Sequence, residues 1–577
     1  MPHPILILLF PLLAGLLIPV LWSRWGEKTA KIGITAQSAS FVLSVIVLYD
    51  VSQNPPINIA LFPSLSALNP LFGFGLHIDR LAAVMMVLIT GVSSIVHLYS
   101  KTYLQQEPGY ARFFSLLSLI TFALLCLVTS PNLLMLFIFW QLISWLLYLL
   151  LAFNYTHGET CRAAFKTLII FRLGDLFFLA GVFLAYHLYG TLEFPLLFEK
   201  AAASDITLPL LPGGLLTMNG VTAVSLLIFV GAMSKSAQFP LHVWLPDTMF
   251  GPTPVSALMH AGIVNSGGFL LNRLAPLYGL SPASLNLIFA LGAFTTFVGA
   301  SMMLTQNDVK KMLGYSTIAQ MGYMIMECGL GAFALAIFHF IAHGLFKASL
   351  FLNAGSAIHL ARTEPKSPKP TKIARILSEP TTTTPFSRLI WLSGFMITLI
   401  LPLVTLLVAH DVFHIPLSDE AHGAVIFLFF GWVTASQAIL SIYRLNATAS
   451  WKVVGAMISA LVLIIFTYLF AGELFTIFLY PAKGEAAFYF ETAALPTTLF
   501  DFIVIMTSII IISAWVFLYA NARGQHILMP AWVDQFKEKF YVLSMNRLYI
   551  DHFYQRLSRR VIQAANRLDK RYLAWLP

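Results

Sequence analysis

Three ionisable residues lie within one apolar segment of the chain, AIFHFIAHGLFKASLFL, at residues 336–352. His339, His343 and Lys347 follow one another at intervals of four residues. On an α-helix each interval turns by about 400°, so the three side chains share one face over roughly 12 Å. Histidine accepts and releases protons near neutral pH. The spacing therefore predicts a ladder of groups that can pass protons along one helix face.

A fourth ionisable residue, Lys235, lies in the segment GAMSKSAQFPLHVWLPD, ahead of Pro240 and Pro246. Proline breaks a helix because it lacks the N–H donor and its ring collides with the preceding turn. In a membrane, a broken helix frees backbone carbonyl groups and directs helix ends towards a site. A lysine buried there can bind and release a proton under the influence of neighbouring charges. The pattern predicts a protonation site at a helix break.

Three further ionisable residues interrupt apolar segments. His260 lies near the middle of the segment that follows Lys235, where a hydrogen-bonded structural histidine and a protonation site are both possible. The nearby helix break favours the second interpretation. Arg172 and Asp175 are three residues apart in IIFRLGDLFF, so they can neutralise each other on one helix. For this pair a structural ion pair and a functional site remain equally open.

The elements that must position these residues are membrane helices. The chain has 577 residues, of which 58% are hydrophobic and only 10% charged, and its mean hydropathy is +0.81. These values exclude a soluble globular domain. A charge at the centre of a bilayer costs about 3 kcal/mol, so each one there needs a partner, water or a function. Three cysteines without C-x-x-C spacing indicate neither a zinc cluster nor thiol redox chemistry.

The apolar runs predict an all-α polytopic membrane protein of about 15 transmembrane helices. We expect the spans near residues 4–22, 32–50, 79–100, 112–128, 131–152, 165–188, 221–240, 250–274, 284–304, 312–329, 331–358, 386–409, 422–444, 452–471 and 498–520. The first is interpreted as a span rather than a cleaved signal peptide, because it is long and contains proline. Residues 361–388 are polar, basic and rich in proline, which is typical of a connector.

The charges of the connections predict the orientation of the chain, because positive residues stay on the cytoplasmic side. With the N-terminus outside, the inner connections contain Arg24, Lys28, Lys31, Lys101, Arg112, Arg162, Lys166, Lys310, Lys311, Arg362, Lys366, Lys369, Lys372, Arg375, Arg444 and Lys452. The outer connections are acidic. The net charge of +9 is thus mostly a topology signal and does not indicate nucleic-acid binding. Residues 521–577 mix basic and apolar residues at helical spacing and predict an amphipathic cytoplasmic helix that binds headgroups or a partner protein.

The segments MSKSAQFPLHVWLPDTMFGPTPVSALMHA, NDVKKMLGYSTIAQMGYM and FHFIAHGLFKASLFLNAGS resemble the proton-conducting antiporter-like family. This family includes the NuoL, NuoM and NuoN subunits of respiratory complex I, the Mrp cation/proton antiporters and the DabB subunit of an inorganic carbon accumulation system. The resemblance covers roughly residues 75–360 and implies two inverted five-helix repeats with broken helices. It implies a proton pathway made of Lys235, His260, His339, His343 and Lys347, with the pair Arg172 and Asp175 beside it.

The resemblance also implies a division of the chain. We expect N-terminal transmembrane helices at 1–110, a first repeat at 111–274, a second repeat at 275–445, C-terminal transmembrane helices at 446–520 and the basic tail at 521–577. Two positions depart from the complex I pattern. Gln141 stands where the family has a glutamate that pairs with the lysine, and Thr398 stands where it has a second lysine. The tail also ends without the long lateral helix of the largest complex I subunit.

The phrases HAGIVNSGGFLLNRLAPL and YVLSMNRLYIDHFYQRLSRR look most like DabB. That resemblance implies a non-enzymatic subunit of the bacterial inner membrane, which passes protons or Na⁺ inward to drive CO₂ or bicarbonate uptake. It implies a DabA-like partner related to β-carbonic anhydrases that holds the zinc, with no cofactor in this chain. The alternative is a proton-pumping subunit of NADH-quinone oxidoreductase or an Mrp-type antiporter subunit.

Overall fold

A computed structural model describes residues 4–61, 73–209, 217–303, 305–306, 308–363, 459, 470–482, 484–493 and 531–573. Contacts within the chain divide it into two compact units, one made of residues 1–359 with 539–577 and the other of residues 360–538. All seven residues of the predicted proton pathway belong to the first unit, whereas Thr398 lies outside the described residues. The first unit is therefore considered by itself.

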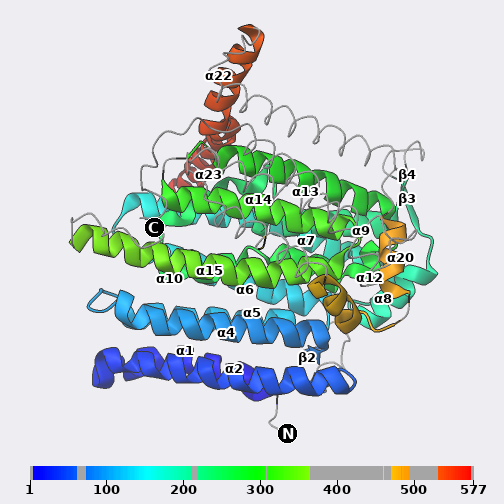
Figure 1. Ribbon diagram of the computed structural model, residues 1–577, viewed down its shortest axis with the longest axis horizontal. Coiled ribbons are helices and arrows are strands. Elements are labelled where there is room, and N and C mark those ends of the chain that lie inside the picture. The colour runs from blue at the N-terminus through cyan, green and yellow to red at the C-terminus, as the bar shows by residue number, and fades with distance from the viewer. Residues whose placement is uncertain are drawn as a thin grey trace. The chain divides into compact units, whose positions relative to one another are not determined.

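The first unit is a bundle of long helices, most of which run nearly parallel or antiparallel to one another (Figure 1). Its helices are α1 (Ile5–Trp25), η1 (Gly26–Thr29), α2 (Ala30–Gln53), α4 (Arg80–Tyr103), α5 (Tyr110–Val128), α6 (Leu133–Leu151), α7 (Gly158–Tyr189), α8 (Phe194–Ala203), α9 (Gly220–Lys235), η4 (Leu241–Phe250), α10 (Thr253–Leu258), η5 (Met259–Ile263), α11 (Ser266–Arg273), α12 (Ala275–Tyr278), α13 (Pro282–Met303), α14 (Val309–Gly329), α15 (Phe333–Thr363), η7 (Arg547–Tyr549) and α23 (Ile550–Leu573). The last residues of α15 and the first residues of α22 (Ala531–Met545) belong to the second unit, and α20 (Glu485–Thr492) lies in it entirely.

Several of these helices begin at residues that cap them. The side chain of Asp79 accepts a hydrogen bond from Ala82 N at 2.8 Å at the start of α4, and Asn132 caps α6 in the same way through Met135 N at 2.7 Å. Such caps satisfy one of the backbone donors that the first turn leaves without a helical partner. The sequence therefore marks where these helices start.

One end of the bundle carries two short antiparallel hairpins, and we call it the strand end (Figure 1). Strand β1 (Ile57–Ala60) pairs with β2 (Gly75–Ile78), and β3 (Thr207–Pro209) pairs with β4 (Thr217–Asn219). Asp79, directly after β2, forms an ion pair of 2.6 Å with Arg273 at the end of α11. Burial alone would raise the pKa of Asp79, but Arg273 outweighs it and holds that pKa below its usual range. This pair joins two helices that are far apart in sequence.

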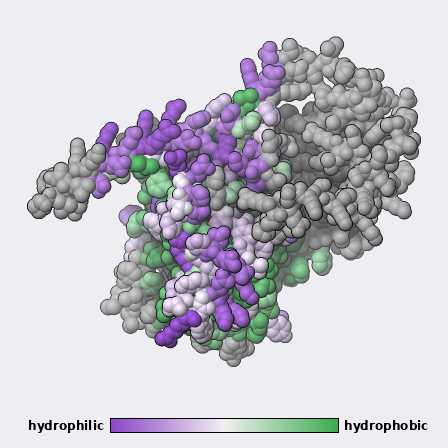
Figure 2. Space-filling model, turned by 90° about the vertical axis from the view of Figure 1, so that its left-hand side faces the viewer, coloured by the Kyte–Doolittle hydropathy of each residue, from purple (hydrophilic) through white to green (hydrophobic). Residues whose placement is uncertain are grey.

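The opposite end, which we call the tail end, carries the connections between α1 and α2, α4 and α5, and α6 and α7. Gln106 N donates to Glu27 Oε1 at 3.0 Å, and Arg112 donates to the carbonyl oxygen of Phe153 at 2.6 Å. Figure 2 looks onto this end and shows hydrophilic residues gathered over it. The connections that the charge pattern assigned to one side of a membrane therefore share one end of the bundle.

The first eleven predicted spans each coincide with helical structure in the described part of the chain. Two of them differ from the prediction, because the span near 221–240 ends at Lys235 and the span near 250–274 is divided into α10, η5 and α11. The chain is not helical between α5 and α6, around Pro131, or between α14 and α15, where Gly331 has a positive φ of 78°. The spans predicted at 386–409, 422–444 and 498–520, and nearly all of 452–471, lie outside the described residues.

Seven described segments are long and apolar enough to cross a membrane, and the first of them, Ile5–Gln53, combines α1 with α2. The chain is therefore a multi-pass membrane protein. Helices inside a bilayer associate through close packing rather than through exclusion from water. Helices α13 and α14 illustrate this, since a Cβ atom on Gly292 would lie 2.6 Å from Met326 N and one on Gly322 would lie 2.5 Å from Thr296 N. The backbones of these two helices touch.

Candidate functional site

The residues singled out from the sequence fall into two buried polar clusters within the bundle. Six of the seven are buried, and Arg172 is partly exposed. The lysine cluster comprises Trp140, Gln141, Arg172, Asp175 and Lys235, and the histidine cluster comprises His260, Glu327, His339, His343 and Lys347. Each is built from helices that the sequence alone could not place side by side.

Lys235 is the last residue of α9 and is fully buried. Its Nζ donates a hydrogen bond to the backbone carbonyl oxygen of Trp140 at 2.5 Å. The same ammonium lies 4.0 Å from the centroid of the Trp140 ring, where the negative face of the ring attracts a cation. Trp140 thus contacts Lys235 through both its backbone and its side chain.

Trp140 also reaches the carboxylate of Asp175. Its Nε1 donates to Asp175 Oδ1 at 2.9 Å, and Asp175 Oδ2 pairs with Arg172 at 2.9 Å. The charges of Asp175 and Lys235 act on each other across this indole. Gln141 stands where the family has a glutamate, but in the structure the buried carboxylate of Asp175, on the neighbouring helix α7, acts on Lys235 instead.

Gln141 is engaged with a different residue. Its amide oxygen accepts a hydrogen bond from Arg172, whose guanidinium also lies 5.5 Å from the ring centroid of Trp145. Arg172 therefore connects Gln141 to Asp175 and balances the charge of that carboxylate. A change at position 141 therefore acts on Arg172 and Asp175, the two charged groups that act on Lys235.

The break after Lys235 is stabilised by side chains that satisfy the freed backbone carbonyl groups. Trp244 Nε1 donates to Ser234 O at 2.9 Å and Gln238 Nε2 to Ser236 O at 2.8 Å, while Ser236 Oγ donates to Val264 O, on the next membrane segment, at 2.6 Å. Gly267 lies against this Ser236, since a Cβ atom added to it would overlap the Ser236 hydroxyl. The structure confirms a break between Lys235 and Pro240, and the chain continues as the 3₁₀ helix η4.

His260 lies in the π-helical segment η5. Its ring is fully buried and stacks on Phe351 of α15 at 4.4 Å between centroids. Neither ring nitrogen has a hydrogen-bond partner among the described residues. A π-helical turn within a longer helix is a frequent mark of a functional site, and here it carries the histidine.

His339, His343 and Lys347 do share one face of α15. The rings of His339 and His343 lie 6.1 Å apart, and the charges of Lys347 and His260 both act on His343. Lys347 Nζ donates to Ser316 Oγ at 2.9 Å and to Leu313 O at 3.3 Å, both on α14. The predicted ladder is present as a spatial arrangement.

Two helices bring His260 to this ladder. Gly344, next to His343, packs directly on η5, because a Cβ atom there would lie 2.8 Å from Ala261 O. A residue with a side chain at position 344 would push α15 away from the π-helical segment. The close approach therefore places His260, His343 and Lys347 in one buried cluster.

One member of the cluster, Glu327, is not among the residues predicted from the sequence. Glu327 on α14 is 1% exposed and its Oε2 lies 3.0 Å from His339 Nδ1. Gln320, also on α14, lies 3.0 Å from the other ring nitrogen of His339. A lone carboxylate in the apolar segment MGYMIMECGL would have been a signal, since a charge at this depth needs a partner or a function.

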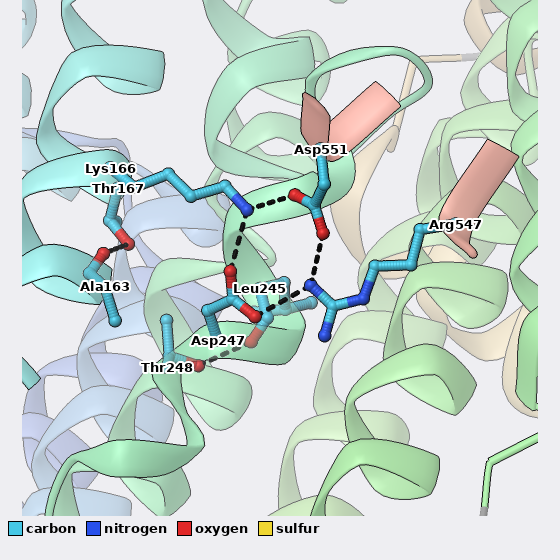
Figure 3. A network of polar contacts seen from close by, with 8 residues as sticks. All are labelled: Ala163, Lys166, Thr167, Leu245, Asp247, Thr248, Arg547 and Asp551. Atoms are coloured by element: carbon cyan, nitrogen blue, oxygen red, sulfur yellow. Dashed lines mark hydrogen bonds and ion pairs between the residues drawn. The ribbon is translucent and has the colours of Figure 1, made fainter. Parts of the chain in front are cut away.

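A third polar cluster, at the tail end, was also missed. Lys166 of α7 and Asp247 of η4 form a ring of four charges with Arg547 of η7 and Asp551 of α23 (Figure 3). We call this ring the charge clamp. Lys166 is 81 residues from Asp247 and 385 residues from Asp551 in the sequence. No local sequence pattern could therefore have predicted this ring.

Two family models match the chain. The model described as "NADH:quinone oxidoreductase/Mrp antiporter, TM" matches residues 130–431, and that described as "NADH-Ubiquinone oxidoreductase (complex I), chain 5 N-terminus" matches residues 69–114. The solved structure of the Mrp complex from Dietzia sp. DQ12-45-1b contains a chain with a similar fold, with a TM-score of 0.58 and 23% identity over 98% of this chain and 60% of that one. The chain belongs to the complex I and Mrp antiporter family of ion-translocating membrane subunits.

Within that family the chain is similar over its whole length to the "Probable inorganic carbon transporter subunit DabB1" of Halothiobacillus neapolitanus. The two are 38% identical over 99% of this chain and 98% of that protein. Subunit L of the NADH-quinone oxidoreductase of Neisseria meningitidis is 39% identical over 61% of this chain and 53% of that subunit. The chain thus spans about half the length of its complex I relatives, whereas it spans nearly all of DabB1.

Proposed function

We propose that the chain is the proton-conducting membrane subunit of a two-part inorganic carbon transporter. In this function it couples a cation gradient to CO₂ or bicarbonate uptake by a partner related to carbonic anhydrases. The observation that carries the proposal is the histidine cluster, in which His260, His343 and Lys347 meet at the centre of the bundle. Full-length similarity to DabB1 supports the choice of transported substrate.

The chemistry of each residue suits stepwise proton transfer. A neutral imidazole accepts a proton at one ring nitrogen and releases one from the other, so His339 and His343 can relay protons without turning over. Glu327 stands at one end of the relay, 3.0 Å from His339, and Lys347 stands at the other. The ring centroids are 6.1 Å apart, and neither ring nitrogen of His343 has a hydrogen-bond partner among the described residues, so a water molecule between the rings would complete the step.

The lysine cluster is proposed as the second station of the path. Lys235 can take up a proton and hold it against Trp140 O while Asp175 balances the charge from the far side of the indole. Ser236 connects this station to the start of α11, because its Oγ bonds Val264 O. The path would then run from Lys235 past His260 to the ladder.

The finer architecture belongs to the same proposal. We infer about 15 transmembrane helices arranged as two inverted five-helix repeats, with the N-terminus outside the bacterial inner membrane and the C-terminus in the cytoplasm. The tail end would face the cytoplasm, so the basic tail would contact the partner there. That partner would hold the zinc and carry out the hydration chemistry, and this chain would need no cofactor.

The test is uptake of labelled bicarbonate by cells that express the chain together with a carbonic-anhydrase-related partner. Lys235→Ala and Lys347→Ala should each lower uptake at least tenfold while the complex still assembles, because they remove relay groups. An uncoupler should abolish uptake by the unaltered pair. Full uptake by both variants, or uptake that is unchanged by the uncoupler, would refute the proposal.

A second candidate function is supported by the match to complex I relatives over 61% of the chain. In that case the chain would pump protons or exchange cations within a larger respiratory or antiporter assembly. Affinity purification of the chain with metal analysis separates the two candidates. A co-purifying zinc protein supports carbon uptake, and co-purifying respiratory subunits support the alternative.

A further inference from the structure

The charge clamp links the C-terminal tail to the segment that follows Lys235. Lys166 Nζ lies 2.7 Å from Asp247 Oδ2 and also pairs with Asp551. Arg547 Nη1 lies 2.8 Å from Asp247 Oδ1 and 2.6 Å from Asp551 Oδ2. Positive and negative groups thus alternate around a closed ring, as Figure 3 shows. Each charge has two partners of opposite sign.

The clamp is largely withdrawn from solvent. Its side chains are between 12% and 19% exposed, so the ion pairs are screened less than pairs on an open surface. The charges of Lys166, Arg547 and Asp551 also act on His242 of η4, which is buried. The tail therefore contacts partly buried residues of the bundle through Arg547 and Asp551.

A short chain of contacts leads from the clamp to Lys235. Asp247 lies one turn of η4 after Trp244, whose Nε1 donates to Ser234 O. The Trp244 ring packs edge-on against Phe171 of α7 at 4.7 Å between centroids. Ser234 immediately precedes Lys235, so a displacement of η4 would move the end of α9.

The tail side of the clamp has an unusual backbone. Arg547, Leu548 and Tyr549 all have positive φ values, of 55°, 55° and 56°. Residues other than glycine rarely adopt this conformation and persist in it only where the surrounding contacts hold them. The left-handed turn directs Arg547 back towards Asp247, and the ion pairs are the contacts that hold it.

We propose that Arg547 and Asp551 are positioning residues for the Lys235 site, which they act on through Asp247 and η4. When the clamp is closed, η4 covers the break, and Lys235, Ser236 and Gln238 are fully buried. Release of the tail frees η4 and opens this end of the path to water. The assignment rests on the proposed function only in that Lys235 is taken as a conducting residue.

The experiment measures access to the break by thiol labelling, independently of carbon uptake. Cys126, Cys161 and Cys328 are replaced, and Ser236→Cys is introduced as the reporter. Fragmented membranes that contain the full-length chain expose both faces to a small charged methanethiosulfonate, and labelling is followed by mass. The reporter should react slowly in the parent and at least tenfold faster after Arg547→Gln or Asp551→Asn.

Three controls make the result specific. Arg547→Lys keeps a cation that can reach the carboxylates of Asp247 and Asp551. The Ser236→Cys reporter should therefore still be labelled slowly in this variant. Arg559→Gln neutralises an exposed arginine of α23 outside the clamp and should also have no effect on labelling. Ser225→Cys, a buried position on α9 nearer the strand end, should stay unreactive in every background.

The outcomes are decisive in either direction. Equal labelling of the reporter in the parent, Arg547→Gln and Asp551→Asn would overturn the inference. Fast labelling of both Ser236→Cys and Ser225→Cys in the clamp variants would show general loosening and would also overturn it. Failure of the proposed function would instead appear as normal uptake by the Lys235→Ala variant, whatever the labelling shows.

Discussion

Lys235 donates a hydrogen bond to the backbone carbonyl oxygen of Trp140, at 2.5 Å, at the point where α9 ends. A backbone acceptor cannot be removed by substitution and carries no full charge, so the ammonium is held without being neutralised. The nearest balancing charge shown by the contacts is Asp175, on the far side of the Trp140 indole. This arrangement makes the indole the link between the lysine and its counter-charge.

Replacement of Trp140 by phenylalanine tests that link. Trp140→Phe keeps the backbone carbonyl and an aromatic face for Lys235 but removes the Nε1 donor to Asp175. A buried carboxylate that loses a hydrogen bond costs about 1–3 kcal/mol, so we expect carbon uptake to fall about tenfold with normal protein levels. Trp145→Phe is the matched control, because the exposed Trp145 contacts Arg172 and not Asp175. Equal uptake by both variants would contradict a linking role for the indole.

Substitution of Gln141 by glutamate tests the role of charge in the lysine cluster. Gln141 accepts a hydrogen bond from Arg172, so Gln141→Glu would draw the guanidinium towards itself and leave Asp175 less neutralised. The added negative charge should hold Lys235 in its protonated form and slow uptake several-fold without loss of assembly. Gln141→Leu removes the acceptor without adding charge and separates the two effects. Faster uptake in Gln141→Glu than in the parent would show that the lysine must stay charged.

The ladder was predictable from the sequence because an α-helix has 3.6 residues per turn. Residues four apart, such as His339, His343 and Lys347, therefore lie on one helix face. The break after Lys235 was likewise predictable from Pro240. The roles of Glu327 and Asp175 could not be predicted in this way, because their contacts depend on which helices pack against each other. The charge clamp joins residues of distant segments, and only the folded chain shows that Asp551 meets Lys166. Thr398 lies outside the described residues, so its replacement of a family lysine stays a prediction.

Glu327 provides a test of the extended ladder. Its carboxylate lies 3.0 Å from His339 Nδ1 and is buried. Glu327→Gln preserves the shape and a hydrogen-bond acceptor but cannot take up a proton, whereas Glu327→Asp keeps the carboxylate on a shorter side chain. We expect uptake to fall at least tenfold in Glu327→Gln and to be partly retained in Glu327→Asp. If the glutamine variant transports normally, Glu327 serves only to orient His339.

The charge clamp predicts how stability depends on pH. Burial alone would raise the pKa of Asp247, but Lys166 and Arg547 outweigh it and hold that pKa below its usual range. A carboxylate with a lowered folded-state pKa contributes stability that is fully present above its unfolded pKa, about 3.9, and is lost as pH falls through the folded value. Asp247→Asn should therefore lower the Tm of the full-length chain in detergent by a constant amount between pH 5 and 8 and by less below about pH 4. Breaking one partner of a buried ion pair costs about 3 kcal/mol, and less for partly exposed pairs such as these. Asp569→Asn, on α23 outside the clamp, should leave the curve of the parent unchanged, and a Tm difference that grows on acidification would contradict the assignment.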